Sequence, residues 1–199
     1  MCLLIETIRI EDRKLQNAAF HNERFNRSRK ELFGIQQKSS LEDLIDLPVN
    51  LPSGKIKCRV VYSRKIQSIT FSLYIFRKLK TLQLVENDSI DYAFKFHDRQ
   101  QLEKLKQNMT ADDILIIKNG YITDTSYANI VFWDGIKWIT PISPLLSGTM
   151  RSKLLQEDKI QCAELKKSDL RLFKSARIIN AMIGLEESPS IFIKNILGH

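Results

Sequence analysis

The chain has 199 residues and a formal net charge of +8 at pH 7, and 43% of its residues are hydrophobic and 27% charged. This composition is typical of a globular protein with one large domain or two small ones, and it excludes a disordered chain. The basic residues are spread along the sequence and form no stripe with aromatic residues. The charge therefore does not favour a nucleic-acid partner.

The cysteines and the apolar runs limit the possible locations of the protein. Cys2, Cys58 and Cys162 are odd in number and widely separated, with neither zinc-ligand spacing nor a disulfide framework. We therefore expect reduced thiols and no metal site. No secretory leader pattern opens the chain, and no apolar run approaches membrane-spanning length. The sequence predicts a cytoplasmic protein with no membrane partner.

The first part of the chain predicts a mixture of strands and helices. From Asn17, a predicted N-cap, residues of one stripe recur at helical spacing until Gly34, with Arg24 at the edge of the stripe, where it could reach inward. Alternating apolar and polar residues further on predict an antiparallel pair with one buried face. The predicted elements are strands over 3–10, 56–62, 69–75 and 82–85 and helices over 17–34 and 40–47.

Two hairpins dominate the second part. Asn119-Gly120 supplies the two residues with positive φ that a tight hairpin turn requires, and Asp134-Gly135 repeats the arrangement. The segment between the hairpins, 124–129, is polar and small where a buried sheet would be apolar, so we expect it to hold something. The other predicted elements are helices over 100–107 and 149–156, strands over 160–163 and 176–183, and a helical turn over 169–173.

Two further features point to possible chemistry. Ser147 or Thr149 is the predicted cap of the helix over 149–156, and the amides at such a helix start can bind a phosphate, although a capped helix without a ligand explains Ser-Gly-Thr alone. Lys95 lies between two aromatic residues, which by itself suggests an exposed strand position. Residues 1–86 are predicted to form a small α+β domain and residues 87–199 a second domain.

In order along the chain, several segments together resemble the class IV aminotransferase family, the fold-type IV pyridoxal 5'-phosphate enzymes. The segments are Glu6-Thr-Ile-Arg9, His21-Asn-Glu-Arg24, Phe94-Lys95, Gly120-Tyr-Ile-Thr-Asp124 through Asn129-Ile, Thr140-Pro141 and Leu146-Ser-Gly-Thr-Met-Arg151. The resemblance implies an α+β, two-domain fold like that of D-amino-acid aminotransferase, with pyridoxal phosphate as cofactor.

The resemblance also implies roles for individual residues. Lys95 would form the Schiff base with the cofactor and act as the catalytic acid and base, with Thr7 near the substrate. Asp124 would keep the ring nitrogen protonated, because the protonated ring is the electron sink. The cofactor phosphate would be bound by a guanidinium and by backbone amides. The cofactor-binding residues implied are Arg24, Lys95, Asp124, Tyr127, Ala128, Asn129, Gly148, Thr149 and Met150.

The chain departs from the family pattern in three places. The family usually has glutamate where this chain has Asp124, which is one methylene shorter. The chain begins almost directly at the Glu6 segment, without the strand and glycine-rich segment that normally precede it, and it ends soon after Asn180-Ala-Met182. We therefore expect a compact version with shortened termini, in which some substrate-contacting elements are absent.

The reaction is left open between several alternatives. Arg99, four residues after Lys95, and the loop Gly148-Thr-Met-Arg151 are similar to features of aminodeoxychorismate lyases, which eliminate pyruvate to give 4-aminobenzoate. A branched-chain or D-amino-acid aminotransferase and a non-catalytic relative are the alternatives. Arg9, His97 and Arg99 are candidates for binding the substrate, although ion pairs on the surface would explain the arginines equally well. The family implies a homodimer.

Overall fold

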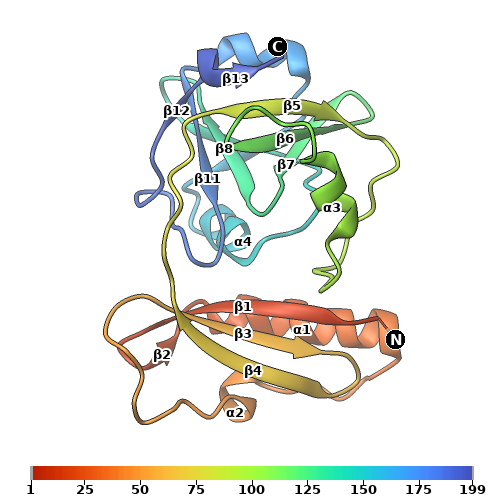
Figure 1. The fold of residues 1–199 in the computed structure, drawn as a ribbon, viewed down its shortest axis with the longest axis vertical. Coiled ribbons are helices and arrows are strands. Elements are labelled where there is room, and N and C mark those ends of the chain that lie inside the picture. The colour runs from red at the N-terminus through yellow and green to blue at the C-terminus, as the bar shows by residue number, and fades with distance from the viewer. Residues whose placement is uncertain (1, 199) are drawn as a thin grey trace. The chain divides into compact units, whose positions relative to one another are not determined.

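The computed structural model of the chain describes residues 2–198, which form two compact units (Figure 1). One unit holds the residues up to Phe76 together with Phe94–Asp98, and the other holds Arg77–Ala93 and the chain from Arg99 on. Each unit combines a sheet with helices, so the predicted α+β class is confirmed.

A four-stranded sheet with the strand order β2-β1-β3-β4 forms the first unit, with neighbouring strands antiparallel. The helix α1 runs along this sheet (Figure 1). The predicted strands, the long helix and the antiparallel pair are confirmed, while the second helix is shorter than predicted. The elements are β1 (Leu4–Glu11), β2 (Lys14–Leu15), α1 (Ala18–Phe33), α2 (Leu41–Leu44), β3 (Ile56–Tyr62) and β4 (Ile66–Leu73).

The core of the first unit lies on one face of β1. Leu4, Ile8 and Ile10 alternate along the strand, and they are buried in one cluster with Phe25 of α1 and Tyr62 of β3. Because strand residues alternate between faces, Glu6 points to the same side as these apolar residues. Glu6 is fully buried. The sequence pattern therefore places a carboxylate inside an apolar core, where it needs partners.

A nine-stranded mixed sheet forms the second unit. Its path runs β10-β9-β8-β7-β6-β5-β13, and β11 pairs with β8 and β12. The elements are β5 (Leu82–Glu86), α3 (Gln100–Leu105), β6 (Asp113–Lys118), β7 (Tyr121–Thr125), β8 (Asn129–Trp133), β9 (Trp138–Pro141), α4 (Thr149–Gln156), β10 (Gln161–Ala163), the 3-10 helix η1 (Lys167–Leu172), β11 (Ser175–Ile179), β12 (Ile191–Phe192), the 3-10 helix η2 (Ile193–Asn195) and β13 (Ile196–Leu197).

The first predicted hairpin is confirmed and the second is wrong in its turn. Asn119 and Gly120 have φ of 51° and 79° and join β6 to β7. Between β8 and β9 the chain instead forms a four-residue loop, Asp134–Lys137, closed by a 3.3 Å hydrogen bond from the Asp134 amide to the Lys137 carbonyl. The Asp134 carboxylate accepts from the amides of Ile136 and Lys137, which holds this wider loop.

One predicted helix cap is confirmed in position and the other is wrong. Asn17 is the N-cap residue of α1, as predicted, but it has the left-handed conformation, with φ of 56°, and its side chain caps no amide. The residue at the N-cap position of α4 is Gly148, which has no side chain, so the prediction of Ser147 or Thr149 at that position is wrong.

The limits of the two units differ from the predicted domains 1–86 and 87–199. β5 pairs in parallel with β6, which places it in the second unit. Lys95 belongs to the first unit, because the Lys95 carbonyl accepts from the Ile5 amide at 2.9 Å and Phe96 forms a β-bridge with Leu4. Short-range patterns in the sequence did not contain these pairings.

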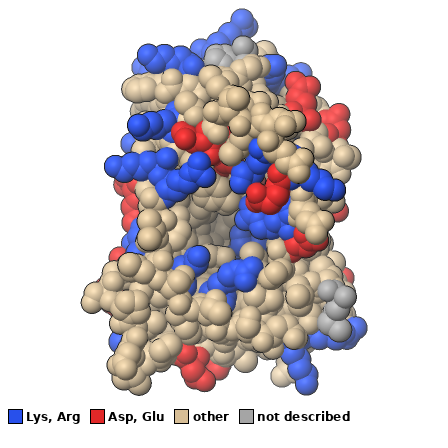
Figure 2. Space-filling model, in the orientation of Figure 1, with Lys and Arg blue, Asp and Glu red and all other residues tan. Residues whose placement is uncertain are grey.

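Two observations concern the surface and the helices. Among residues 2–198, no helix is both long and apolar enough to cross a bilayer. On the face shown in Figure 2, Lys and Arg side chains lie in several separate places with Asp and Glu among them.

Candidate active site

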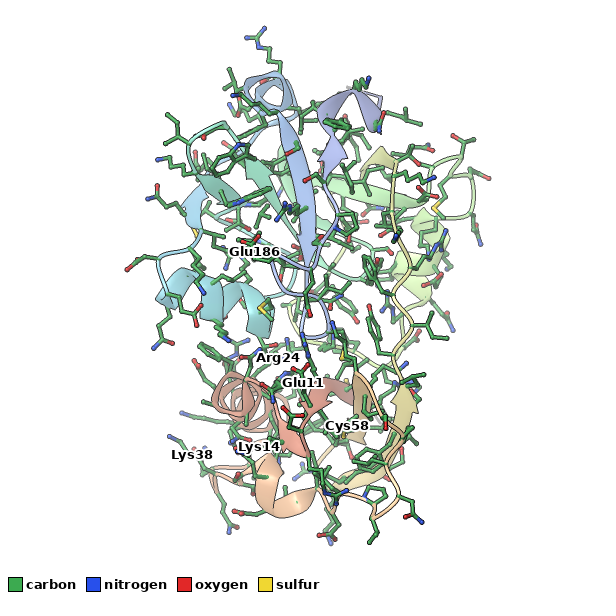
Figure 3. The ribbon with its side chains drawn as sticks, turned by 90° about the vertical axis from the view of Figure 1, so that its left-hand side faces the viewer. Glu11, Lys14, Arg24, Lys38, Cys58 and Glu186 are labelled. Carbon is green, nitrogen blue, oxygen red and sulfur yellow. The ribbon has the colours of Figure 1, made fainter. Side chains whose placement is uncertain are left out.

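The first unit contains a buried ionic cluster built by β1 and α1. Arg24 extends from α1 (Figure 3) and donates from Nε to Glu6 Oε1 at 2.8 Å and from Nη2 to Glu6 Oε2 at 2.6 Å. His21 Nδ1 lies 2.6 Å from Glu6 Oε2. All three side chains are buried, and the inward reach predicted for Arg24 is confirmed.

The charges of this cluster follow from its geometry. Burial would raise the pKa of Glu6, but the charge and hydrogen bonds of Arg24, helped by His21, lower it to about 2. Burial lowers the pKa of His21, and the positive charges of Arg24 and Lys95 act in the same direction. At neutral pH the cluster therefore holds an ionised Glu6, a charged Arg24 and a neutral His21.

Lys95 lies beside this cluster in the first unit. Its side chain is half-buried, and its charge reaches His21. Phe94 and Phe96 flank it, with ring centroids 6.0 Å apart, and both rings pack against the apolar core. Lys95 therefore lies between two aromatic side chains and close to the cluster of Glu6, His21 and Arg24.

The other candidates of the first unit lie elsewhere. Thr7 and Arg9 alternate with Glu6 along β1 and therefore point to the opposite face of the sheet, where both are half-buried. Arg9 Nη2 donates to Glu11 Oε1 at 2.9 Å. His97 is exposed, and its amide donates to the Leu3 carbonyl. The structure thus groups Arg24 and Lys95 but leaves Thr7 and Arg9 on the other face.

The second unit contains a buried carboxylate held by neutral donors. Asp124 lies at the end of β7, and its Oδ1 accepts from Asn129 Nδ2 at 2.7 Å while its Oδ2 accepts from the Leu146 amide at 3.0 Å. Burial raises the pKa of Asp124 to about 6, although these donors and the charge of Arg151 lower it in part. A buried carboxylate of this kind is stabilised by a cation placed against it.

The start of α4 lies next to this carboxylate. Asn129 Nδ2 also donates to the Leu146 carbonyl at 2.8 Å, two residues before Gly148. Thr149 and Met150 are the first residues of α4, and the Met150 side chain packs into the apolar core. The backbone amides of the first turn and the helix dipole make this helix start suitable for an anion such as phosphate.

A tight turn connects Asp124 to Asn129. The Thr125 amide and hydroxyl both donate to the Ala128 carbonyl at 3.0 Å, and Tyr127 is half-buried at the tip. Arg99 Nη2 donates to the Ser126 carbonyl at 2.7 Å. The polar segment between the predicted hairpins is therefore a buried turn in which Arg99 holds the backbone.

Sequence reasoning missed two members of these clusters. The strand pattern places Glu6 on the same face as Ile8 and the resemblance includes it in a motif, but neither gives it a role, and it is the acceptor that fixes both His21 and Arg24. An acidic residue in the apolar alternation of β1 was the available signal. Leu146 acts through its backbone, and no residue pattern could have revealed that.

Comparison with known proteins identifies the group to which these features belong. A sequence model described as amino-transferase class IV matches residues 3–187. The chain belongs to the class IV aminotransferase family. Members of this family are pyridoxal phosphate-dependent enzymes, so the chain is a pyridoxal phosphate-dependent lyase or aminotransferase, and its fold is of type IV.

Individual relatives agree with this assignment. An uncharacterized protein of Haemophilus influenzae is 42% identical over 185 residues, which cover 92% of this chain and 98% of that one. A provisionally named 4-amino-4-deoxychorismate lyase of Haemophilus somnus has 34% identity, a TM-score of 0.85 and coverage of 93% and 98%.

More distant structures share the fold. A provisionally named amino-acid aminotransferase of Mesorhizobium loti has 20% identity, a TM-score of 0.78 and coverage of 96% of this chain and 99% of that one. A hypothetical aminotransferase of Mycobacterium tuberculosis, in a PLP-bound form, has 14% identity, a TM-score of 0.71 and coverage of 95% and 80%.

The residues of this chain fit the family cofactor. Asp124 is a buried carboxylate with neutral donors on both oxygens, and a protonated pyridine nitrogen is a cation that would stabilise it. The start of α4, with Gly148 at its N-cap, suits the phosphate.

Proposed function

We propose that the chain catalyses the reaction of a 4-amino-4-deoxychorismate lyase, in which pyruvate is eliminated and 4-aminobenzoate is formed. The observation that carries this choice is the 34% sequence identity, over 93% of this chain, to the Haemophilus somnus protein that is provisionally named as such a lyase. Arg99, four residues after Lys95, and the loop Gly148-Thr-Met-Arg151 support it, since both are similar to features of the lyases.

Lys95 is the catalytic residue of this proposal. Its amine would hold the cofactor aldehyde covalently, and Lys95 is half-buried, with its charge acting on His21. Once the substrate amine had replaced it, the Lys95 amine would remove the proton from the ring carbon that bears the amine. The C–O bond to the enolpyruvyl group would break as the ring becomes aromatic, and the released enolate would become pyruvate by taking a proton at its methylene carbon. Bound pyridoxal phosphate supplies the electron sink for this proton removal.

The remaining residues bind and orient. By resemblance to the family, Asp124 would keep the ring nitrogen protonated, and its turn, with Tyr127, Ala128 and Asn129, would support the ring. Arg24 and the amides of Gly148, Thr149 and Met150 are the groups that would hold the phosphate. On the substrate side we assign Thr7, Arg9, His97 and Arg99, of which Arg99 also holds the Ser126 carbonyl.

The wider setting is part of the same proposal. A homodimer is expected, as in the family, and a cytoplasmic enzyme of folate biosynthesis is consistent with the product 4-aminobenzoate. The partners are then a small amine substrate and a second copy of this chain, without nucleic acid or membrane. Size-exclusion chromatography with light scattering measures the oligomeric state, and a monomer at micromolar concentration would contradict the dimer.

An aminotransferase is the second candidate. The Mesorhizobium loti protein named for that activity shares the fold over 96% of this chain. A branched-chain or D-amino-acid aminotransferase would use Lys95 to move a proton between the amino acid α-carbon and the cofactor, with an oxo acid restoring the aldehyde. A non-catalytic relative is the third candidate, and it would not bind the cofactor covalently.

The first experiment measures the visible absorbance of the protein after incubation with pyridoxal phosphate and desalting. We expect a retained band that borohydride shifts permanently and that Lys95→Ala lacks. Lys106→Ala is the matched control, because Lys106 is also a half-buried lysine but pairs with Glu103. A band of equal strength in Lys95→Ala would refute the role of Lys95. If the native protein showed no band, the third candidate, a non-catalytic relative, would be the remaining explanation.

The second experiment separates the reactions. Aminodeoxychorismate is supplied to the loaded protein, and 4-aminobenzoate and pyruvate are measured in equal amounts. In parallel, D-alanine and branched-chain amino acids are supplied with 2-oxoglutarate. Glutamate formation without 4-aminobenzoate would replace the lyase assignment with the aminotransferase.

A further inference from the structure

Asn129 connects the end of β7, where Asp124 lies, to the segment that precedes α4. Its Nδ2 donates to Asp124 Oδ1 at 2.7 Å and to the Leu146 carbonyl at 2.8 Å. Asp124 in turn accepts from the Leu146 amide at 3.0 Å. The Leu146 residue is therefore held at its N–H by Asp124 and at its C=O by Asn129.

The same side chain also packs against the residue that begins α4. A Cβ added to Gly148 would overlap with Asn129 Oδ1, so the amide of Asn129 fills the space beside the glycine. Gly148 itself has φ of −73°, which any residue adopts, and the glycine is therefore required by this contact rather than by its backbone conformation. Asn129 is 5% exposed, and both ends of its amide are engaged in this way.

We propose that Asn129 is a positioning residue that couples the Asp124 carboxylate to the N-terminus of α4. This inference rests on the proposed function, in which Asp124 contacts the cofactor ring nitrogen and the start of α4 binds the phosphate. Because the Asn129 amide contacts both Asp124 and the residues before α4, a displacement of the start of α4 moves Asp124, and a displacement of Asp124 moves the start of α4. The ring-nitrogen end and the phosphate end of the proposed cofactor site therefore move together.

This coupling has a consequence for ligands that occupy only one end. An anion at the start of α4 orders Gly148 and Leu146, and through Asn129 it orders Asp124. A pyridine ring at Asp124 should then bind more tightly, since part of the ordering has already occurred. By linkage, the ring must raise the affinity for the anion by the same factor.

Because Asp124 has a shorter side chain than the family's usual glutamate, its position depends more strongly on the contacts of Asn129. Aspartate has one methylene less than the glutamate usual in the family, so its carboxylate lies closer to its own backbone. Hydrogen bonds from Asn129 and Leu146 fix both of its oxygens, which limits the rotation of the carboxylate about its side-chain bonds.

The test uses pyridoxal and inorganic phosphate as two separate probes on the full chain. We measure the affinity for pyridoxal with and without saturating phosphate, and the affinity for pyridoxal phosphate, by titration of the visible band. In the native protein, phosphate should tighten pyridoxal binding. In Asn129→Ala, the tightening should vanish, and the affinity for pyridoxal phosphate should fall by about 10- to 100-fold, as for loss of a hydrogen bond to a charged group.

A second variant keeps the shape of the side chain. Asn129→Asp places two carboxyl groups side by side, so the second of their two protons should leave at a higher pH than the proton of Asp124 alone. The affinity for pyridoxal phosphate should therefore change in an additional step at higher pH that the native protein lacks, which a merely structural role would not produce. This profile remains measurable if Asn129→Ala fails to fold.

Asn26→Ala is the matched control, because Asn26 Nδ2 also bridges two groups, the carbonyls of Asn22 and Ser39, at 2.8 and 2.9 Å. It should leave the coupling and the pH profile unchanged. A native protein that binds no pyridoxal phosphate would overturn the proposed function and this inference with it. A native protein that binds it, together with undiminished coupling in Asn129→Ala or a pH profile of Asn129→Asp that lacks the additional step, would overturn the inference alone.

Discussion

Glu6 holds Arg24 by two parallel hydrogen bonds inside the apolar core of the first unit, at 2.8 and 2.6 Å. A carboxylate and a guanidinium buried in this way depend on one another, because either charge alone would lose its solvation without compensation. The pair also fixes the plane of the guanidinium that we propose for the cofactor phosphate. Its removal should therefore affect folding and binding together.

The first prediction concerns the stability of this pair. Glu6→Gln should lower the free energy of unfolding by about 3–5 kcal/mol, because Arg24 is left as a buried unpaired charge. Urea denaturation measures this loss. Glu11→Gln is the control. Glu11, labelled in Figure 3, pairs with Arg9, but its side chain is 46% exposed, so the loss of its charge should cost about 1 kcal/mol or less. Equal losses in the two variants would contradict the prediction.

The pH dependence of the same pair gives a second prediction. The pKa of Glu6 is lowered from 4.5 to about 2, since Arg24 and His21 outweigh the effect of burial. The ionised Glu6 contributes about 3 kcal/mol to the free energy of unfolding. This contribution is present above pH 4.5 and is lost as the pH falls toward 2. The stability difference between the native protein and Glu6→Gln should therefore shrink over this range. A constant difference would mean that Glu6 is not ionised in the folded chain.

Asp124 should show the opposite pH dependence in the cofactor-free protein. Burial raises its pKa from 3.8 to about 6, so the folded chain holds the proton more tightly than the unfolded chain. Stability should fall by up to about 3 kcal/mol as the pH rises from about 4 to about 6. Asp124→Asn cannot titrate, and the native protein should lose stability relative to it across this window. Thermal unfolding at several pH values compares the native protein with Asp124→Asn. If the stabilities of the two proteins changed equally with pH, the raised pKa of Asp124 would be refuted.

A fourth prediction concerns the space at Gly148. Gly148→Ala should destabilise the protein by about 1–3 kcal/mol, because the new methyl group displaces the Asn129 amide. Gly184→Ala is the control, since its Cβ would only approach the flexible Glu187 side chain at 3.4 Å. Chemical denaturation measures both. In the Asn129→Ala background the cost of Gly148→Ala should be smaller, and strictly additive losses would show that the two residues do not interact.

Several elements could be predicted from the sequence because their causes are local. The helix over 149–156 and the Asn119-Gly120 hairpin have the predicted limits, since helical spacing and positive-φ residues lie within a few positions of one another. Arg24 was correctly expected to reach inward from the edge of its stripe. The order of the motifs was also sufficient to indicate the family.

Contacts between distant segments decided the rest. The partner of Arg24 is Glu6, eighteen positions earlier, and the Asp124 carboxylate is fixed by the Leu146 backbone, twenty-two positions later. The loop Asp134–Lys137 is wider than predicted, because the Asp134 side chain binds two amides in place of a tight turn. The sequence alone determined which residue types were available and which local elements they form. Only the tertiary structure decided which buried charge meets which donor, because burial removes water and leaves each polar group dependent on the partner that the fold supplies.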